Sequence, residues 1–403
     1  MYFRVMKAQI DKLQHISQKS ERLIIGLMSG TSLDGLDIAC CRIKGSGPET
    51  EAQLENFITV PYEPFFQEQV REVFAKRTID QQVLCGLNAY IGNIHGEMIN
   101  YALELWNMQP ETIDLIASHG QTVYHAPQSF TQDDRYPNST LQIGDADHIA
   151  VKTGIITLAD FRQKHLAAGG EGAPLAAYGD FLLFTDEDEN RVLLNIGGIS
   201  NFTLLPRRNS HTEAYATDLG PGNTLMNQYM YQEFKLEMDK HAQLAKSGQV
   251  HKALLAALLD ESFLAAAFPK TTGPERYNLA YLAAAQSRAQ AKDLTPADIM
   301  ATLNCFAAQA IVEGIKRATA GMDNVVVYIS GGGLHNPLLV ENIRQGLKNE
   351  KVCSFEALGM NPDAKEACLF AVLANETLAG RDNGLAGVKG SPRACMGKIS
   401  LPY

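Results

Sequence analysis

Two short apolar runs joined by a small polar turn, near the start of the chain, constrain the fold more than any other feature. Residues 23–28 and 38–43 each have the length and composition of a buried strand, and residues 30–37 between them are GTSLDGLD. Glycine lets a ligand come close to the backbone, and the Thr and Ser hydroxyls add to the amide donors. The pattern predicts a β-hairpin whose tip either binds a phosphate or is an ordinary polar turn.

A second hairpin of similar design opens the other half of the chain. Residues 192–196 and 200–205 are predicted strands, and Gly197 and Gly198 form the turn between them. Because each half opens on such a hairpin, the sequence indicates a duplicated α/β domain. We expect an N-terminal extension over residues 1–20, a first domain over 21–185 and a second over 186–403, with the last helix able to pack back on the first domain.

Three consecutive glycines, Gly331, Gly332 and Gly333, follow another predicted strand at residues 325–329. Glycine turns after several strands favour a nucleotide site, in which the hairpins hold the phosphates and the triple glycine leaves a flat surface for the base or ribose. The alternative is a tight turn that lets a helix pack closely. No G-x-x-x-x-G-K-[ST] motif occurs and no G-x-G-x-x-G motif opens a helix, which excludes a P-loop and disfavours a dinucleotide fold.

Three aspartates are candidates for chemistry. Asp34 and Asp37 lie inside the first hairpin tip, where a triphosphate would repel them unless Mg²⁺ intervened. Asp34 is therefore a candidate magnesium ligand, although either residue could instead organise the turn. Asp218 ends a predicted short strand before a Gly-Pro-Gly turn and a helix, so its carboxylate is either a general base beside a helix N-terminus or a helix cap.

Polar side chains also follow two predicted strands in the first half. Ser118, His119 and Gln121 come after one strand, and Asp160 and Arg162 come after another. Strand ends are the usual edge of a ligand site in α/β proteins, and these side chains offer the hydroxyl, amide, imidazole and guanidinium groups that bind sugars. His119 could equally be a hydrogen-bonded histidine of the core.

Composition excludes several classes of partner. The chain has 403 residues and a formal net charge of -10, so we expect no surface for nucleic acid or acidic lipid. Its seven cysteines have no C-x-x-C spacing, and reduced thiols suit a cytoplasmic protein. Residues 1–20 are mixed in charge and lack a long apolar stretch, so we expect neither a signal peptide nor a membrane span there.

Many separate motifs resemble one known family in order and spacing. They are GLMSGTSLDGLD, SHGQTV, LQIGD, ADFR, GGEGAPL, LNIGGISN, DLGPGNTLM, PKTTGPERYN and SGGGLHNPLL. From about Arg22 to the C-terminus, the chain is similar to the anhydro-N-acetylmuramic acid kinases. The resemblance implies an α/β, two-domain actin/hexokinase-like (ribonuclease H-like) fold with a cleft between the domains.

The resemblance also implies an unusual phosphoryl transfer in peptidoglycan amino-sugar recycling. ATP phosphorylates O6 of 1,6-anhydro-N-acetylmuramic acid while water adds at C1 and opens the internal ether bridge, which gives N-acetylmuramic acid 6-phosphate and ADP. Because O6 is bonded to C1 and has no proton to lose, the base must deprotonate the water. ATP and Mg²⁺ are the implied cofactors and the sugar is the implied partner. Family members resemble homodimers.

Motif matches carry functional residues of the family onto this chain. Asp218 matches the catalytic aspartate, and Glu366 falls at an active-site glutamate. Ser118, His119, Gln121, Asp160 and Arg162 fall in sugar-side motifs. The expected nucleotide site consists of the clasp residues Gly30, Thr31, Ser32, Leu33, Asp34, Gly35, Leu36 and Asp37, with Gly197, Gly198, Gly331, Gly332 and Gly333.

The chain departs from the family pattern at several positions. Asn227, Glu171 and Pro274 stand where relatives often carry Asp, Gln and Arg, which bears on substrate fit and leaves the catalytic aspartate intact. Two alternative functions stay open. One is a nucleotide-driven switch or filament of the actin and chaperone type, which would bind ATP without sugar-dependent turnover. The other is a kinase for a different hydroxylated sugar.

Overall fold

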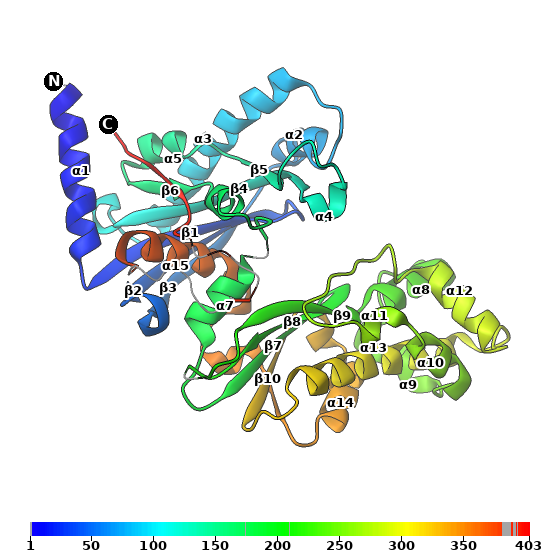
Figure 1. The fold of residues 1–403 in the computed structure, drawn as a ribbon. Coiled ribbons are helices and arrows are strands. Elements are labelled where there is room, and N and C mark those ends of the chain that lie inside the picture. The colour runs from blue at the N-terminus through cyan, green and yellow to red at the C-terminus, as the bar shows by residue number, and fades with distance from the viewer. Residues whose placement is uncertain (1, 174, 209, 381–387, 390–391, 393) are drawn as a thin grey trace. The chain divides into compact units, whose positions relative to one another are not determined.

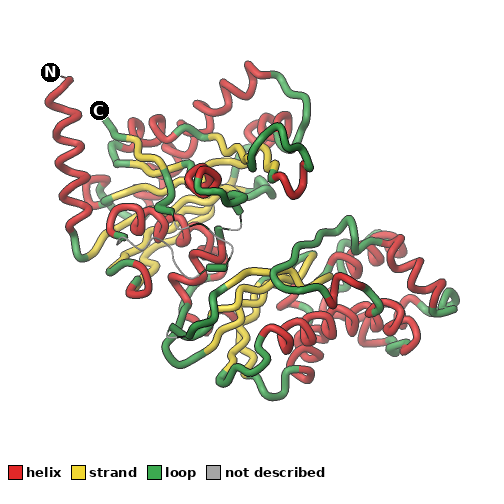
Figure 2. The backbone as a smooth tube through the Cα atoms, viewed as in Figure 1, coloured by secondary structure: helices red, strands yellow, loops and turns green. Residues whose placement is uncertain are grey.

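The computed structural model describes residues 2–173, 175–208, 210–380, 388–389, 392 and 394–403, so Pro174 of the GGEGAPL motif lies outside the described residues. The chain forms two compact units: Met1–Leu183 with Met360–Tyr403, and Phe184–Gly359. Each unit is a mixed α/β body built around one sheet (Figures 1 and 2). The last helix, α15 (Lys365–Ala379), packs against β1, β2 and β4 of the first unit.

The sheet of the first unit has seven strands in the order β12-β6-β4-β1-β2-β3, with β5 paired to β4. β2 is antiparallel to both β1 and β3, whereas β4 is parallel to β1 and to β6. The strands are β1 (Glu21–Ser29), β2 (Gly35–Lys44), β3 (Glu51–Pro61), β4 (Leu115–Ala126), β5 (Ser139–Ile143), β6 (Thr157–Ala159) and β12 (Lys398–Ser400).

The sheet of the second unit repeats the central topology of the first. Its order is β11-β10-β7-β8-β9, in which β8 is antiparallel to β7 and β9, and β10 is parallel to β7 and β11. The strands are β7 (Asn190–Ile196), β8 (Ile199–Leu205), β9 (Tyr215–Pro221), β10 (Val325–Ser330) and β11 (Lys351–Ser354). Both predicted hairpins are therefore present, each at the same place in its sheet, which confirms the predicted duplicated α/β design.

Helices cover both sheets. The first unit has α1 (Tyr2–Gln18), α2 (Pro64–Val73), α3 (Gln81–Leu105), α4 (Gln128–Thr131), α5 (Ala146–Thr153), α6 (Phe161–Ala167) and α15, and α7 (Ala176–Phe184) ends where the second unit begins. The second unit has α8 (Thr224–Phe234), α9 (Gln243–Ser247), α10 (Lys252–Leu259), α11 (Ser262–Ala265), α12 (Leu279–Arg288), α13 (Pro296–Ala318) and α14 (Pro337–Gly346). Single 3-10 turns occupy Gly47–Glu49, Pro110–Thr112, Lys240–Ala242, Gly332–His335, Phe355–Leu358 and Pro362–Ala364.

The N-terminal extension is a helix fastened to the first unit. Ile16 of α1 is buried, and the Arg22 guanidinium donates to the carbonyls of Ile16, Ser17 and Lys19. The described part of the chain contains no helix with both the length and the apolar character needed to cross a membrane.

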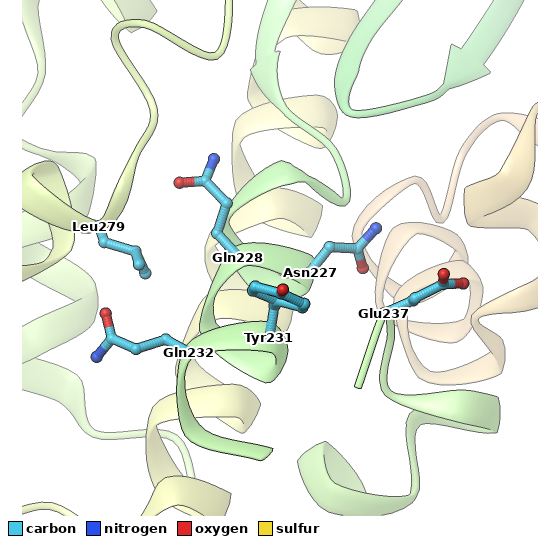
Figure 3. Close-up of a pocket in the computed structure, with 6 residues that line it drawn as sticks. All are labelled: Asn227, Gln228, Tyr231, Gln232, Glu237 and Leu279. Carbon is cyan, nitrogen blue, oxygen red and sulfur yellow. The ribbon is translucent and has the colours of Figure 1, made fainter. Parts of the chain in front are cut away.

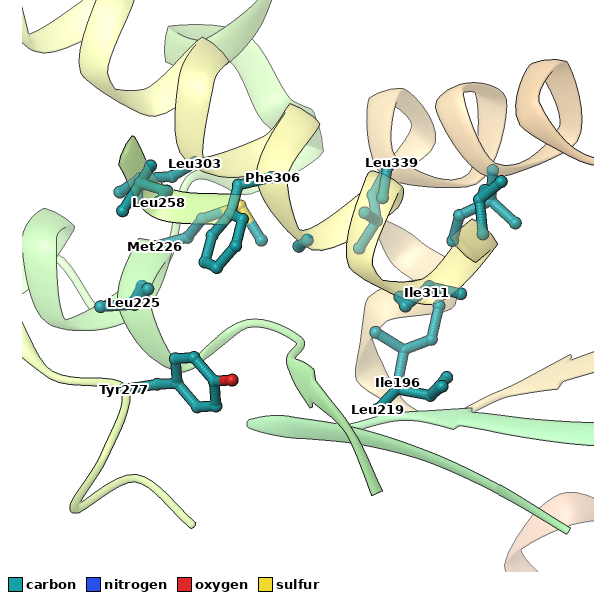
Figure 4. Close-up of a cluster of buried hydrophobic side chains, with 14 of the residues drawn as sticks. Ile196, Leu219, Leu225, Met226, Leu258, Tyr277, Leu303, Phe306, Ile311 and Leu339 are labelled. Carbon is teal, nitrogen blue, oxygen red and sulfur yellow. The ribbon is translucent and has the colours of Figure 1, made fainter. Parts of the chain in front are cut away.

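The core of the second unit positions the helices that border the glycine turns. Phe306 and Ile311 of α13 lie with Leu225 of α8 and with Ile196 and Leu219 of the sheet in one buried cluster (Figure 4). Burying apolar side chains contributes roughly 1.5–3 kcal/mol each. This packing sets the first turn of α8 against the end of β7.

Candidate active site

The tip of the first hairpin has the predicted small polar turn. β1 and β2 pair as far as Ser29 and Leu36, and Thr31 and Ser32 at the tip are exposed. Asp34 organises this turn, because its Oδ1 accepts hydrogen bonds from Ser32 Oγ (2.6 Å) and from the N–H of Gly35 (3.2 Å). Within the described residues, Asp34 Oδ2 has no hydrogen-bond partner, so one carboxylate oxygen is left for a ligand.

The second aspartate of the tip, Asp37, is half-buried. Its Oδ1 accepts a hydrogen bond from Thr59 Oγ1 (2.6 Å). Burial raises the pKa of Asp37, and the nearby charges of Asp34 and Asp363 raise it further, although the Thr59 hydroxyl opposes them. A cation at this tip would relieve the repulsion among these carboxylates.

His119 and Arg162 meet directly in the first unit. Arg162 donates from Nε (3.1 Å) and Nη2 (3.0 Å) to His119 Nε2, and from Nη1 to the carbonyl of Gly172 (2.7 Å). Burial lowers the pKa of His119 to about 3, and the Arg162 charge adds to the effect. His119 is therefore a neutral imidazole that orients the guanidinium of Arg162.

Glu366 stands in the first turn of α15 and belongs to the same electrostatic neighbourhood. Its side chain is exposed, yet the protein atoms around the carboxylate raise its pKa, against the lowering effects of Lys365 and Arg162. Asp37 also raises the pKa of Glu366. The charges of Arg162 and Asp37 thus act on Glu366, although the three residues lie far apart in the sequence.

The other three residues predicted on the sugar side are engaged elsewhere. Ser118 and Gln121 are fully buried; Ser118 Oγ accepts a hydrogen bond from the N–H of Gly120 (3.2 Å), and Gln121 binds Ser29. Asp160 forms an ion pair with Lys398 of β12. The side chains of Ser118 and Gln121 therefore have no exposed surface to offer a ligand.

In the second unit, the three glycine turns converge. The N–H groups of Gly222 and Asn223 donate to the carbonyls of Gly198 (2.8 Å) and Gly197 (2.9 Å). A Cβ on Gly222 would lie 2.4 Å from the Gly197 oxygen, and one on Gly331, whose φ is +83°, would lie 2.5 Å from Asn195 Oδ1. Only glycine allows this close approach, so the triple glycine is a tight, closely packed turn that also borders the second hairpin.

Asp218 lies within β9, three residues before the end of the strand. Its Oδ2 accepts a hydrogen bond from the N–H of Thr272 (2.8 Å), and its own N–H donates to the carbonyl of Lys270 (2.9 Å). Burial raises the pKa of Asp218; the Thr272 N–H and the Lys270 charge oppose this, whereas Glu275 adds to it. The N-cap of α8 is Asn223, so Asp218 does not cap that helix.

An open hollow of about 570 Å³ lies on α8 and was not predicted from the sequence (Figure 3). It is lined by Asn227, Gln228, Tyr231, Gln232, Glu237 and Leu279. Asn227 and Tyr231 follow Asn223 at intervals of four residues, so one strip of the helix runs from the glycine turns into the hollow. The four-residue spacing of Asn223, Asn227 and Tyr231 is the signal in the sequence that could have revealed the hollow. The contacts of Thr272 and Lys270 with Asp218 had no local signal beyond the motif that contains them.

Comparison with known proteins identifies the family. Residues 22–401 match the family model described as anhydro-N-acetylmuramic acid kinase. The protein of that name from Pseudoalteromonas atlantica (strain T6c / ATCC BAA-1087) is 50% identical, over 98% of this chain and 100% of that protein. Those from Caldanaerobacter subterraneus subsp. tengcongensis (39% identical; 97% and 100%) and Bacillus cereus strain 03BB102 (36% identical; 94% and 99%) are also similar throughout. The chain therefore belongs to the anhydro-N-acetylmuramic acid kinase family.

Proposed function

We infer that this chain transfers a phosphoryl group from ATP to O6 of 1,6-anhydro-N-acetylmuramic acid as water opens the 1,6-bridge, in peptidoglycan amino-sugar recycling. Family membership over residues 22–401 supports this reaction. The assignment of Asp218 as the base rests on the hydrogen bond that its Oδ2 accepts from the Thr272 N–H. A cytoplasmic location is supported by the seven cysteines, all described and all free. The homodimer implied by the resemblance stays a prediction.

Asp218 is the proposed base that takes a proton from the attacking water. The Thr272 N–H fixes Oδ2, and within the described part of the chain Oδ1 has no hydrogen-bond partner, so it is the oxygen left to accept the water proton. A raised pKa makes a carboxylate a stronger base. As water bonds to C1, the electron pair of the C1–O6 bond moves to O6, which then bonds to the γ-phosphoryl group of ATP as the bond between that group and ADP breaks.

The turnover number is expected to fall at acidic pH, because protonated Asp218 cannot accept a proton. Burial raises the pKa of Asp218, so the acid limb of the kcat profile lies above the ordinary range of aspartate. Glu275 also raises this pKa, so Glu275→Gln is expected to move the limb to lower pH by less than about one unit. A kcat–pH profile measures this, and exposed Glu213→Gln in the same unit is the control. A limb that stays in place in Glu275→Gln would assign the titration to another group.

Arg162 and Glu366 are the proposed sugar-side groups of the first unit. Neutral His119 holds the Arg162 guanidinium in place, and a fixed guanidinium suits the lactyl carboxylate of the muramic sugar. Glu366, which feels the charge of Arg162, is proposed to position the reacting groups.

The first hairpin tip is the proposed phosphate clasp, and its residues fit Mg²⁺. Thr31 offers an exposed hydroxyl donor, whereas the Ser32 hydroxyl donates to Asp34 Oδ1, and Asp34 Oδ2 is the one carboxylate oxygen proposed for the ion. Mg²⁺ commonly takes one or two carboxylates and fills its remaining positions with phosphate oxygens and water. When bound, Mg²⁺ neutralises charge on the phosphates.

The hollow on α8 is the proposed nucleoside pocket. Tyr231 is eight positions after the N-cap residue Asn223, which is about 12 Å along the helix axis. This span suits a nucleoside attached to phosphates at the glycine turns. The Tyr231 ring is 61% exposed; the Lys235 ammonium lies over one face, 5.3 Å from the ring centroid, and the other face is proposed to stack on a base. Asn227 and Glu237 offer amide and carboxylate groups to the base or ribose.

Tyr231→Ala is expected to raise KM for ATP about fivefold, because one base–aromatic stack is lost. Steady-state kinetics with varied ATP measure this. Phe234→Ala is the matched control, since Phe234 is an exposed aromatic residue of the same helix outside the hollow. Equal effects of the two substitutions on KM for ATP would show that the nucleobase of ATP does not bind in this hollow.

Isotope labelling tests the reaction itself. In H₂¹⁸O, the label is expected at C1 of the product sugar and not in phosphate. Label in phosphate would mean ATP hydrolysis, as in the switch or filament alternative. Turnover of free N-acetylmuramic acid in place of the anhydrosugar would instead support a kinase for a different sugar.

A further inference from the structure

A chain of buried hydrogen bonds lies beneath the first hairpin tip and has no part in the chemistry described so far. Ser29, the last residue of β1, donates from Oγ to Gln121 Oε1 (2.5 Å), and the Tyr62 hydroxyl donates to Ser29 Oγ (2.7 Å). His95 Nε2 lies 2.9 Å from the same Tyr62 oxygen. All four side chains are at most 4% exposed, so water does not compete for these bonds.

The donors in this chain have one consistent order. The Ser29 hydroxyl proton goes to Gln121, so Ser29 accepts from Tyr62, and Tyr62 in turn accepts from His95 Nε2–H. Burial lowers the pKa of His95 to about 3 and raises the pKa of Tyr62, so both side chains are uncharged at neutral pH. A neutral hydrogen-bonded chain in a dry interior is rigid.

Tyr62 contacts the hairpin tip at two places. Its backbone N–H donates to the carbonyl of Asp34 (3.2 Å), and its hydroxyl binds Ser29, which directly precedes Gly30. Its ring stacks on Phe66 with centroids 4.0 Å apart, which leaves the hydroxyl little freedom. One residue outside the tip therefore holds both the entry and the far side of the turn.

We propose that Tyr62 is a positioning residue for the phosphate clasp, and that its hydroxyl and its backbone N–H keep residues 30–34 in the shape that binds ATP. This inference rests on the role proposed above for the hairpin tip. The tip exposes Thr31 and Ser32 to solvent, so the support that shapes it comes from the buried side. Gln121 then belongs to the same support, since its Nε2 lies 3.5 Å from the carbonyl of Gly30.

Tyr62→Phe is the test, because it removes the hydroxyl and keeps the ring stack and the backbone N–H. KM for ATP is expected to rise about three- to tenfold, the effect of one buried hydrogen bond, while KM for the sugar changes less than about twofold. Ser29→Ala leaves Tyr62 in place and is expected to raise KM for ATP likewise, so it serves if Tyr62→Phe does not fold.

Tyr178→Phe is the matched control. Tyr178 is also fully buried in the first unit, and its hydroxyl donates to the carbonyl of Pro392 (2.9 Å), away from the tip. Its loss is expected to lower stability and leave KM for ATP unchanged. An unchanged KM for ATP in both Tyr62→Phe and Ser29→Ala, or an equal rise in Tyr178→Phe, overturns the proposal.

A charged variant of the tip distinguishes the phosphate-binding role of the tip from the positioning role of Tyr62. Ser32→Glu places a negative charge in the turn and is expected to raise KM for ATP if the tip binds phosphates. An unchanged KM for ATP in Ser32→Glu would show that the tip does not bind the phosphates. If KM for ATP rises in Ser32→Glu but not in Tyr62→Phe, only the positioning role of Tyr62 is contradicted.

Discussion

Asp218→Asn is expected to lower kcat by at least about two orders of magnitude, the lower end of the contribution of a general base, while ATP still binds. The amide oxygen of asparagine can accept the hydrogen bond from the Thr272 N–H as Oδ2 does now, so the fold around β9 is kept. The amide cannot take a proton from water. Steady-state kinetics give kcat, and calorimetry gives the affinity for ATP.

Asp293→Asn is the control for that experiment, because Asp293 is an exposed aspartate of the same unit. It is expected to leave kcat unchanged. Near-normal turnover of Asp218→Asn would restrict Asp218 to holding the segment that contains Thr272, and the base would have to be sought elsewhere.

Gly222→Ala is expected to raise KM for ATP at least about tenfold, because the added methyl group would push apart the converging glycine turns of the second unit. The added Cβ would lie 2.4 Å from the carbonyl oxygen of Gly197, a backbone atom that cannot rotate away. Either the second hairpin tip or the start of α8 must move. Since Asp218 lies in β9 and is held by Thr272, kcat at saturating ATP is expected to fall much less than KM rises.

Gly86→Ala in α3 is the matched control, because an added Cβ there meets no atom within 4 Å. Far-ultraviolet circular dichroism and urea unfolding check that both variants fold. A KM for ATP in Gly222→Ala equal to that of the wild type would show that the glycine turns do not hold the phosphates.

Local patterns were enough to predict the elements that carry the site. In the sequence, apolar residues recur every three or four positions over residues 83–105, and Pro296 follows the capping residue Thr295; each pattern indicates a helix within one segment, and the structure has both, α3 and α13. The two hairpins followed from glycine turns between short apolar runs. The same reasoning placed Asp218 at a strand end, whereas β9 continues through Pro221 because Ile199 and Ser200 of β8 pair with its last residues.

Side-chain direction at the strand ends was harder to predict than position. Gln121 sits in the expected motif, but the register between β1 and β4 shifts between Leu27 and Ser29, and Gln121 pairs with Ser29. Its amide is consequently buried under the hairpin tip. A register shift depends on two strands that are distant in the sequence, so no periodicity within either strand reveals it.

The sequence alone identified the family, the paired hairpins and the aspartate proposed as the base, because motif order and short-range periodicity are written along the chain. Tertiary structure alone assigned partners: neutral His119 to Arg162, the Thr272 N–H to Asp218, and Tyr62 to both ends of the first tip. Those contacts join segments that are remote in sequence. Their geometry, and the pKa shifts that burial produces, arise only when the chain has packed.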